Sequence, residues 1–226
     1  MIELCGVSHA FGDRRVLHDI TVTLAEPRIG VIGSNGSGKS TFARLLNGLI
    51  VPDAGWVRVD GLDTRHQAKA VRRQVGFVFQ NPDHQIILPT VAEDLAFGLT
   101  NLKMKRAEIQ QRVDAMLIQY GLKDWRDHPA HLLSGGQKQL LAIAAVLIMQ
   151  PRYLIFDEPT TLLDLRNRNQ IRRILWNLSQ PIVVVSHDLD LLQDFDRILL
   201  FDNGQIVMDA PPAIALPAYV EQMAWL

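Results

Sequence analysis

The chain has 226 residues, of which 48% are hydrophobic and 21% charged, and its formal net charge is −1. This balance is typical of a globular protein, and the charge gives no electrostatic case for binding nucleic acid or anionic lipid. Cys5 is the single cysteine, which excludes an internal disulfide and favours a reducing compartment. The longest apolar run, at 140–149, is too short to span a bilayer, and the N-terminus lacks an export signal. We therefore expect a soluble or peripheral protein.

Short segments rich in Ile, Val and Leu predict strands in the first third of the chain. These strands cover 2–8, 18–24, 28–32, 56–59 and 74–79, and residues 39–49 have helical spacing. The strand at 28–32 runs directly into a glycine-rich loop at 33–41.

Between 84 and 150 the apolar residues recur at helical spacing, which predicts an inserted helical lobe. Near-continuous apolar strands return at 153–158, 181–188, 197–202 and 205–210. Such strands, alternating with helices, indicate a mostly parallel buried sheet and an α/β fold. We expect one domain, 1–226, with a core at 1–83 and 151–210, the lobe at 84–150 and a short C-terminal cap at 211–226.

The loop GSNGSGKST matches the phosphate-binding pattern G-x-x-x-x-G-K-[ST] in full. Its glycines allow backbone angles that turn successive N–H groups toward phosphate oxygens, and its strand–loop–helix context disfavours a chance glycine turn. Lys39 is expected to reach the β and γ phosphates, and Ser40 to bind Mg²⁺. The predicted ATP-binding residues here are Gly33, Ser34, Asn35, Gly36, Ser37, Gly38, Lys39, Ser40 and Thr41.

Two acids end the predicted buried strand YLIFDE. Asp157 suits Mg²⁺ held through water, and Glu158 is placed to polarise an attacking water. A solvated strand end is the alternative, but together with the phosphate loop the pair predicts ATP hydrolysis with ATP and Mg²⁺ as cofactors.

A second anion-binding pattern, LLSGGQKQL, lies at 132–140. Ser134, Gly135 and Gly136 offer a hydroxyl and exposed N–H groups at a predicted helix start, although a plain serine N-cap would look the same.

With these motifs in this order, nearly the whole chain resembles the ATP-binding cassette (ABC) ATPases. The resemblance implies a P-loop core, an N-terminal antiparallel β subdomain and an inserted helical subdomain. In that family the signature of one subunit closes on ATP held by a second subunit. Ser134, Gly135, Gly136 and Gln137 would thus act on a partner's ATP, most simply in a homodimer.

The resemblance implies roles for four further residues. Phe11 would stack on adenine, Gln80 would sense Mg²⁺ and the attacking water, Asp164 would act across the dimer, and His187 would contact the γ-phosphate. Taken alone, a phenylalanine near an N-terminus such as Phe11 is more often a core residue, and His187 after a strand could equally be a plain loop residue. Asp164 lies in the segment that corresponds to the family's D-loop, where Leu162 and Leu163 stand in place of the smaller residues that are usual.

The segment FQNPDHQIILPTVAEDLAFG at 79–98 resembles the energy-coupling factor (ECF) subgroup of vitamin and metal-ion importers. The residues that carry the resemblance are Asn81, Pro82, Asp83 and Gln85, followed by Val91, Glu93, Asp94, Ala96, Phe97 and Gly98. The first four are expected to couple the chain to a membrane partner, and Ile86, Ile87 and Leu88 to make apolar contacts with it, although these three could simply pack in the lobe.

The ECF resemblance implies a pair of ATPase subunits, a transmembrane coupling protein and a small membrane protein that captures the substrate. The chain would then sit peripherally on the cytoplasmic face of the cell membrane. Its length resembles the shorter ATPases of biotin and metal-ion systems, and biotin is our first candidate substrate.

Two alternatives remain open. One is an ABC transporter ATPase outside the ECF subgroup. The other is a soluble ABC ATPase acting on nucleic acid or ribosomes, although such proteins usually carry coiled coils, paired cassettes or basic extensions that this chain lacks. A cassette that binds ATP without hydrolysing it is disfavoured because Glu158 and His187 are present.

Overall fold

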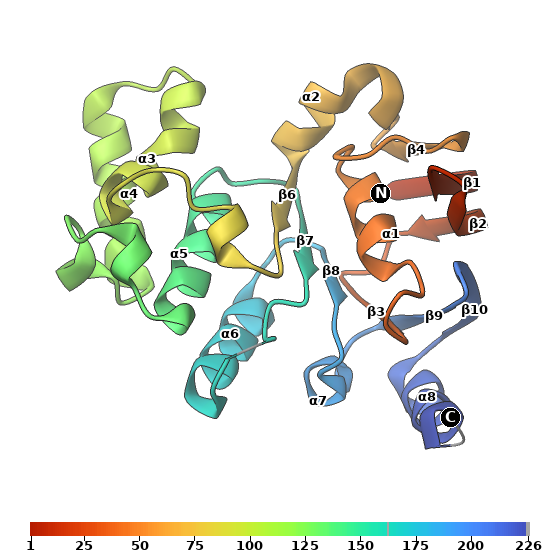
Figure 1. Cartoon of the computed structure of the whole chain (residues 1–226). Coiled ribbons are helices and arrows are strands. Elements are labelled where there is room, and N and C mark those ends of the chain that lie inside the picture. Colours follow the sequence, from red (N-terminus) through yellow and green to blue (C-terminus); the bar gives the residue numbers. More distant parts are fainter. Residues whose placement is uncertain (162, 225–226) are drawn as a thin grey trace. The chain divides into compact units, whose positions relative to one another are not determined.

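The computed structural model describes residues 1–161 and 163–224, and it divides into two compact units (Figure 1). The first unit contains Met1–Phe77, Arg152–Glu158 and the described part of the segment that begins at Ser179. The second contains Val78–Pro151 and the described part of the segment Pro159–Leu178.

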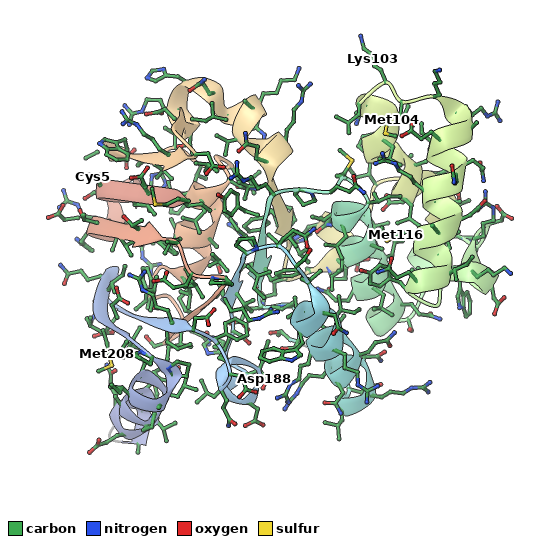
Figure 2. The ribbon with its side chains drawn as sticks, turned by 180° about the vertical axis from the view of Figure 1, so that it is seen from behind. Cys5, Lys103, Met104, Met116, Asp188 and Met208 are labelled. Atoms are coloured by element: carbon green, nitrogen blue, oxygen red, sulfur yellow. The ribbon has the colours of Figure 1, made fainter. Side chains whose placement is uncertain are left out.

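A four-stranded antiparallel sheet forms the N-terminal part of the first unit. Its order is β2-β1-β4-β5, with β1 at Ile2–Phe11, β2 at Arg14–Leu24, β4 at Ala54–Val59 and β5 at Leu62–Asp63. Ile2, Leu4 and Val7 of β1 are buried while Cys5, labelled in Figure 2, is exposed. One face of this sheet is therefore solvated, as is common for antiparallel strands. The predicted antiparallel subdomain is confirmed.

The second sheet has six strands in the order β10-β9-β3-β8-β7-β6. The strands are β3 (Arg28–Gly33), β6 (Val75–Val78), β7 (Tyr153–Asp157), β8 (Ile182–Val185), β9 (Arg197–Asp202) and β10 (Gln205–Ala210). β3 pairs in parallel with β8 and β9, β8 pairs in parallel with β7, and β10 pairs antiparallel to β9. Every residue of β7 and β8 is buried, which explains their unbroken apolar sequence and confirms the mostly parallel sheet.

The helices of the first unit are α1 (Lys39–Leu46), α2 (Thr64–Gln74), α7 (Leu189–Leu192) and α8 (Pro212–Ala224). The apolar face of α1 is buried, and Phe42 packs on Phe201 of β9 with ring centroids 4.9 Å apart. The sequence pattern did not predict α2, because only Thr64 and Val71 are buried along it. The predicted C-terminal cap is mostly the helix α8, which continues through Pro217 and packs on β9 and β10.

The second unit is built from helices. They are the 3₁₀ turns η1 (Pro82–His84), η2 (Lys123–Trp125) and η3 (Ala130–Leu132), with α3 (Val91–Asn101), α4 (Arg106–Gln119), α5 (Gly135–Leu147) and α6 (Leu165–Asn177). α3 packs against α4 and α5, and a Cβ at Gly98 would lie 2.3 Å from Sδ of Met149, a flexible side chain that would have to shift. Lys103 and Met104 lie at the turn between α3 and α4 (Figure 2). Over the described ranges, no helix combines the length and apolar character needed to cross a bilayer.

Candidate functional site

The phosphate loop joins β3 to α1 and depends on its glycines for backbone shape and close packing. Gly33, Gly36 and Gly38 have φ of 146°, 81° and 103°. A Cβ at Gly33 would lie 2.2 Å from the carbonyl oxygen of Phe201, and one at Gly38 would lie 2.9 Å from that of Val16. The loop is therefore locked against both β9 and β2, and it leads into the N-terminus of α1, where the helix dipole favours an anion.

Lys39 is held within this loop. Its ammonium donates hydrogen bonds to the carbonyl oxygens of Gly33 at 2.8 Å and Ser34 at 2.7 Å. Burial lowers the pKa of Lys39, and the charges of Glu158 and Asp157 oppose that shift. A positive group thus lies close to two carboxylates at the end of β7.

Ser40 and Asp157 meet at the start of α1. The Ser40 hydroxyl donates to Asp157 Oδ1 at 2.9 Å, and Asp157 is almost fully buried. Burial raises the pKa of this carboxyl, against the lowering effects of Ser40, Arg44 and Lys39. A hydroxyl beside a buried carboxylate is an all-oxygen donor set of the kind that Mg²⁺ prefers, so these two residues fit the predicted cation.

Glu158 and His187 form a close pair. His187 Nε2 lies 3.2 Å from Glu158 Oε1, and the backbone N–H of His187 donates to Oε2 at 3.3 Å. Glu158 has a φ of 53°, a left-handed conformation that is costly for a non-glycine residue, and its own N–H donates to the Val185 carbonyl at 2.9 Å. The turn after β7 therefore directs the glutamate toward the loop after β8. Asp188, labelled in Figure 2, begins α7 directly after this histidine.

The sequence did not single out Tyr219, which lies near Glu158, or His9 and Asp53, which lie near Phe11. Tyr219 of α8 is buried, and the negative charge of Glu158 adds to the burial that raises its pKa. Phe11 is 52% exposed, and buried His9 packs edge-on against its ring at a centroid distance of 4.8 Å. His9 Nδ1 lies in turn 3.3 Å from Asp53 Oδ2. No short-range pattern in the sequence marks Tyr219, His9 or Asp53.

The second predicted anion site belongs to the other unit. Ser134 caps α5 in a capping box, because the Gln137 N–H donates to Ser134 Oγ at 3.3 Å and the Ser134 N–H donates to Gln137 Oε1 at 2.9 Å. Gly135 is open, with nothing within 4 Å of an added Cβ. Gly136 is buried instead, and an added Cβ would lie 2.3 Å from Cγ of Asn167.

This contact brings the signature beside the predicted D-loop. Asp164 caps α6 by accepting the N–H of Asn167 at 2.8 Å. Gly136 therefore lets the start of α5 approach the start of α6. Leu162, which departs from the family pattern, lies outside the described residues.

The segment that follows β6 is joined to α5 by a hydrogen bond and an ion pair. Gln85 accepts the Phe79 N–H at 3.2 Å and donates to the Ala142 carbonyl at 2.6 Å. Asp83 Oδ1 pairs with Lys138 Nζ at 2.7 Å. Asn81 caps η1 by accepting the Asp83 N–H at 3.0 Å. Lys138, one residue beyond the signature, is thus a partner that the motif reading missed. Gln80 is exposed in the second unit, and its approach to Mg²⁺ stays a prediction.

Buried Asp94 holds the apolar residues of this segment in place. Its Oδ1 accepts the N–H groups of Ile87 at 2.8 Å and Leu88 at 3.0 Å. As a result Ile87 is 66% exposed, whereas Ile86 and Leu88 are half-buried. Thr90 and Glu93 form a second capping box at the start of α3. The acidic pair of the motif therefore shapes the loop that presents Ile87.

Comparisons with known proteins agree with one another. The family model described as ABC transporter matches residues 17–161. An ABC transporter ATP-binding protein of Deinococcus radiodurans is 62% identical over 225 residues, covering 100% of both chains. The biotin transport ATP-binding protein BioM of Rhizobium etli is 47% identical over 219 residues, covering 97% of this chain and 96% of its own. The solved structure of CbiO1 from Clostridium perfringens, described as part of the ABC transporter complex CbiONQ, superimposes with a TM-score of 0.83 at 30% identity, covering 99% of this chain and 93% of CbiO1.

Proposed function

The chain belongs to the ABC transporter family, and from that membership we propose that this ATP-binding ATPase is the motor subunit of an ECF-type importer. It would power uptake of a vitamin or metal ion, with biotin the first candidate because of the likeness to BioM. The core would comprise 1–83 and 151–210, the signature lobe 84–150 and the C-terminal cap 211–226.

The hydrolytic chemistry would come from the groups clustered in the first unit. Residues 33–41 and the α1 N-terminus would cradle the phosphates of ATP, with Lys39 on the β and γ phosphates. Ser40 and Asp157 would hold Mg²⁺, aided by Gln80; the ion, when bound, neutralises charge on the transferring phosphate. Glu158 would polarise the attacking water, while the side chain and backbone N–H of His187 orient its carboxylate.

The signature and D-loop would act on a second copy of the ATPase. The signature begins α5 with open space at Gly135, and Asp164 lies near it through the contact of Asn167 with Gly136. The residues proposed to act are Ser134, Gly135, Gly136 and Gln137. A chain with a phosphate loop in one unit and a separate anion-suited helix start in the other fits a dimer that sandwiches two nucleotides.

One observation carries the importer proposal. Asp83 and Gln85, from the ECF-like segment, are tied directly to the signature helix by Lys138 and the Ala142 carbonyl. A membrane partner seated on exposed Ile87 would therefore contact a segment fastened to α5. This arrangement supports a peripheral subunit on the cytoplasmic membrane face, coupled to a transmembrane protein and a small substrate-capture protein.

The test is affinity purification of the chain from gently solubilised native membranes, with its partners identified by mass spectrometry. We expect a transmembrane coupling protein and a small substrate-capture protein, and loss of biotin uptake in cells carrying Glu158→Gln. Recovery of the chain alone, or with ribosomal or DNA-bound proteins, would contradict the importer and leave the ATPase chemistry in place.

A further inference from the structure

The hairpin between β1 and β2 lies against the phosphate loop. Gly38 packs so closely on β2 that an added Cβ would lie 2.8 Å from Leu17 Cδ2. At the start of the same strand, Nη2 of Arg14 lies 3.7 Å from a Cβ added at Gly36. Arg14 also pairs in register with Phe11, the predicted adenine platform. Its guanidinium is therefore beside the loop, on a hairpin end that also carries the exposed aromatic ring.

Arg14 is exposed, and within residues 1–161 and 163–224 no carboxylate is paired with it. By contrast, Arg197 in the same unit is held by Glu26 and Asp209. When an arginine pairs with protein carboxylates, the N–H groups of its guanidinium already have acceptors. The uncompensated guanidinium of Arg14 instead adds positive charge at the mouth of a loop whose own N–H groups suit phosphate.

We propose that Arg14 is a further ligand of the nucleotide phosphates, donating its N–H groups to the phosphate chain from its position beside Gly36 of the loop. The inference rests on the proposed nucleotide site at residues 33–41 and adds a residue that none of its motifs contains. Guanidinium–phosphate hydrogen bonds are charge-assisted and can be bidentate. Because Lys39 and the loop supply the other contacts, Arg14 tightens binding of ATP and ADP and takes no part in the chemical step.

The neighbouring arginine provides a matched control. Arg15 has the same charge, is also exposed and sits on the same strand, but it pairs in register with Ala10. Successive side chains of a strand point to opposite faces, so Arg15 is directed away from the face that Arg14 occupies. Any effect of total charge alone is the same for the two variants.

The experiment measures equilibrium dissociation constants of the purified full chain for ATP and ADP by calorimetry, with Mg²⁺ present. We expect Arg14→Ala to weaken both by about tenfold or more, the loss of a charge-assisted hydrogen bond. Arg15→Ala should stay within about twofold of the parent, as usual for an exposed charge without a defined partner. Arg14→Lys should recover part of the loss, because it keeps the charge without the fork.

Equal dissociation constants for Arg14→Ala and the parent, or equal losses for Arg14→Ala and Arg15→Ala, would overturn the proposal. Unchanged thermal unfolding of Arg14→Ala without nucleotide shows that the loss concerns the ligand and not the fold. The membrane-partner purification does not depend on Arg14, so a failed importer proposal would leave this result unaffected.

Discussion

The two predicted anion sites of this chain are built in different ways. In the first unit, polar side chains contact the two carboxylates directly: Ser40 contacts Asp157, and His187 contacts Glu158. In the second unit the signature presents backbone and a capped serine, and its neighbours Asn167 and Lys138 act as supports. The first site concentrates buried charge that suits catalysis. The second has open space at Gly135 and is proposed to act on the ATP of a second subunit.

The largest expected effect tests the first site. Glu158→Gln should lower steady-state ATP hydrolysis by about 10²-fold or more, because a general base contributes about that much, while ATP binding persists. Size-exclusion chromatography should then show an ATP-dependent dimer. Glu108→Gln, on the exposed face of α4, is the matched control and should hydrolyse ATP normally. A Glu158→Gln protein with parental turnover would remove Glu158 from the mechanism.

The next test concerns packing in the second unit. Gly136→Ala should lower the free energy of unfolding by about 1–3 kcal/mol, because its Cβ would overlap Asn167. Gly135→Ala, with open space around it, should change stability by no more than about 0.5 kcal/mol. Urea unfolding measures both. Adding Asn167→Ala should relieve most of the Gly136→Ala loss, and a double mutant no more stable than Gly136→Ala would rule out this contact as the cause.

A smaller effect on stability is expected from the buried carboxylate of Asp157. Because burial raises the pKa of this carboxyl above 3.8, its ionised form costs stability in the folded state. That cost is absent below pH 3.8, grows as pH rises through the raised pKa, and is complete above it. Asp157→Asn should therefore raise the thermal unfolding temperature at pH 7 while abolishing Mg²⁺-dependent hydrolysis. A lower unfolding temperature at pH 7 would mean that Ser40 and the nearby cations outweigh the burial cost.

The smallest effect on stability is expected from breaking the ion pair between Asp83 and Lys138 of α5. Asp83 is 59% exposed, so Asp83→Asn should cost about 1 kcal/mol or less. The ratio of substrate uptake to ATP hydrolysis, measured in membranes, should nevertheless fall. The ECF-like segment then loses one of its polar contacts with the signature helix. Asp114→Asn, which breaks a comparably exposed pair with Arg126, is the control for a lost surface charge. If both variants had the same ratio of uptake to ATP hydrolysis, the Asp83–Lys138 pair would contribute only to stability and not to transport.

Much of the fold follows from local pattern. Fully buried strands such as β7 and β8 read as unbroken apolar runs, and the glycine loop is recognisable because φ above zero and close backbone approach both demand glycine. The local sequence pattern did not predict helices α2 and α8. α2 buries only two residues, which are too few to show a helical period, and the segment of α8 was predicted only as a short cap.

Residue types at fixed short spacing were enough to predict the phosphate loop and the acids that end a buried strand. The order of these motifs along the chain carried the resemblance to the ABC ATPases. The folded chain adds which distant residues meet: His187 with Glu158, Asn167 with Gly136, Lys138 with Asp83, and Arg14 with the loop at Gly36. Each of these contacts joins segments that lie far apart in the sequence, so helical or strand periodicity cannot predict it. Strand order and helix packing alone bring them together.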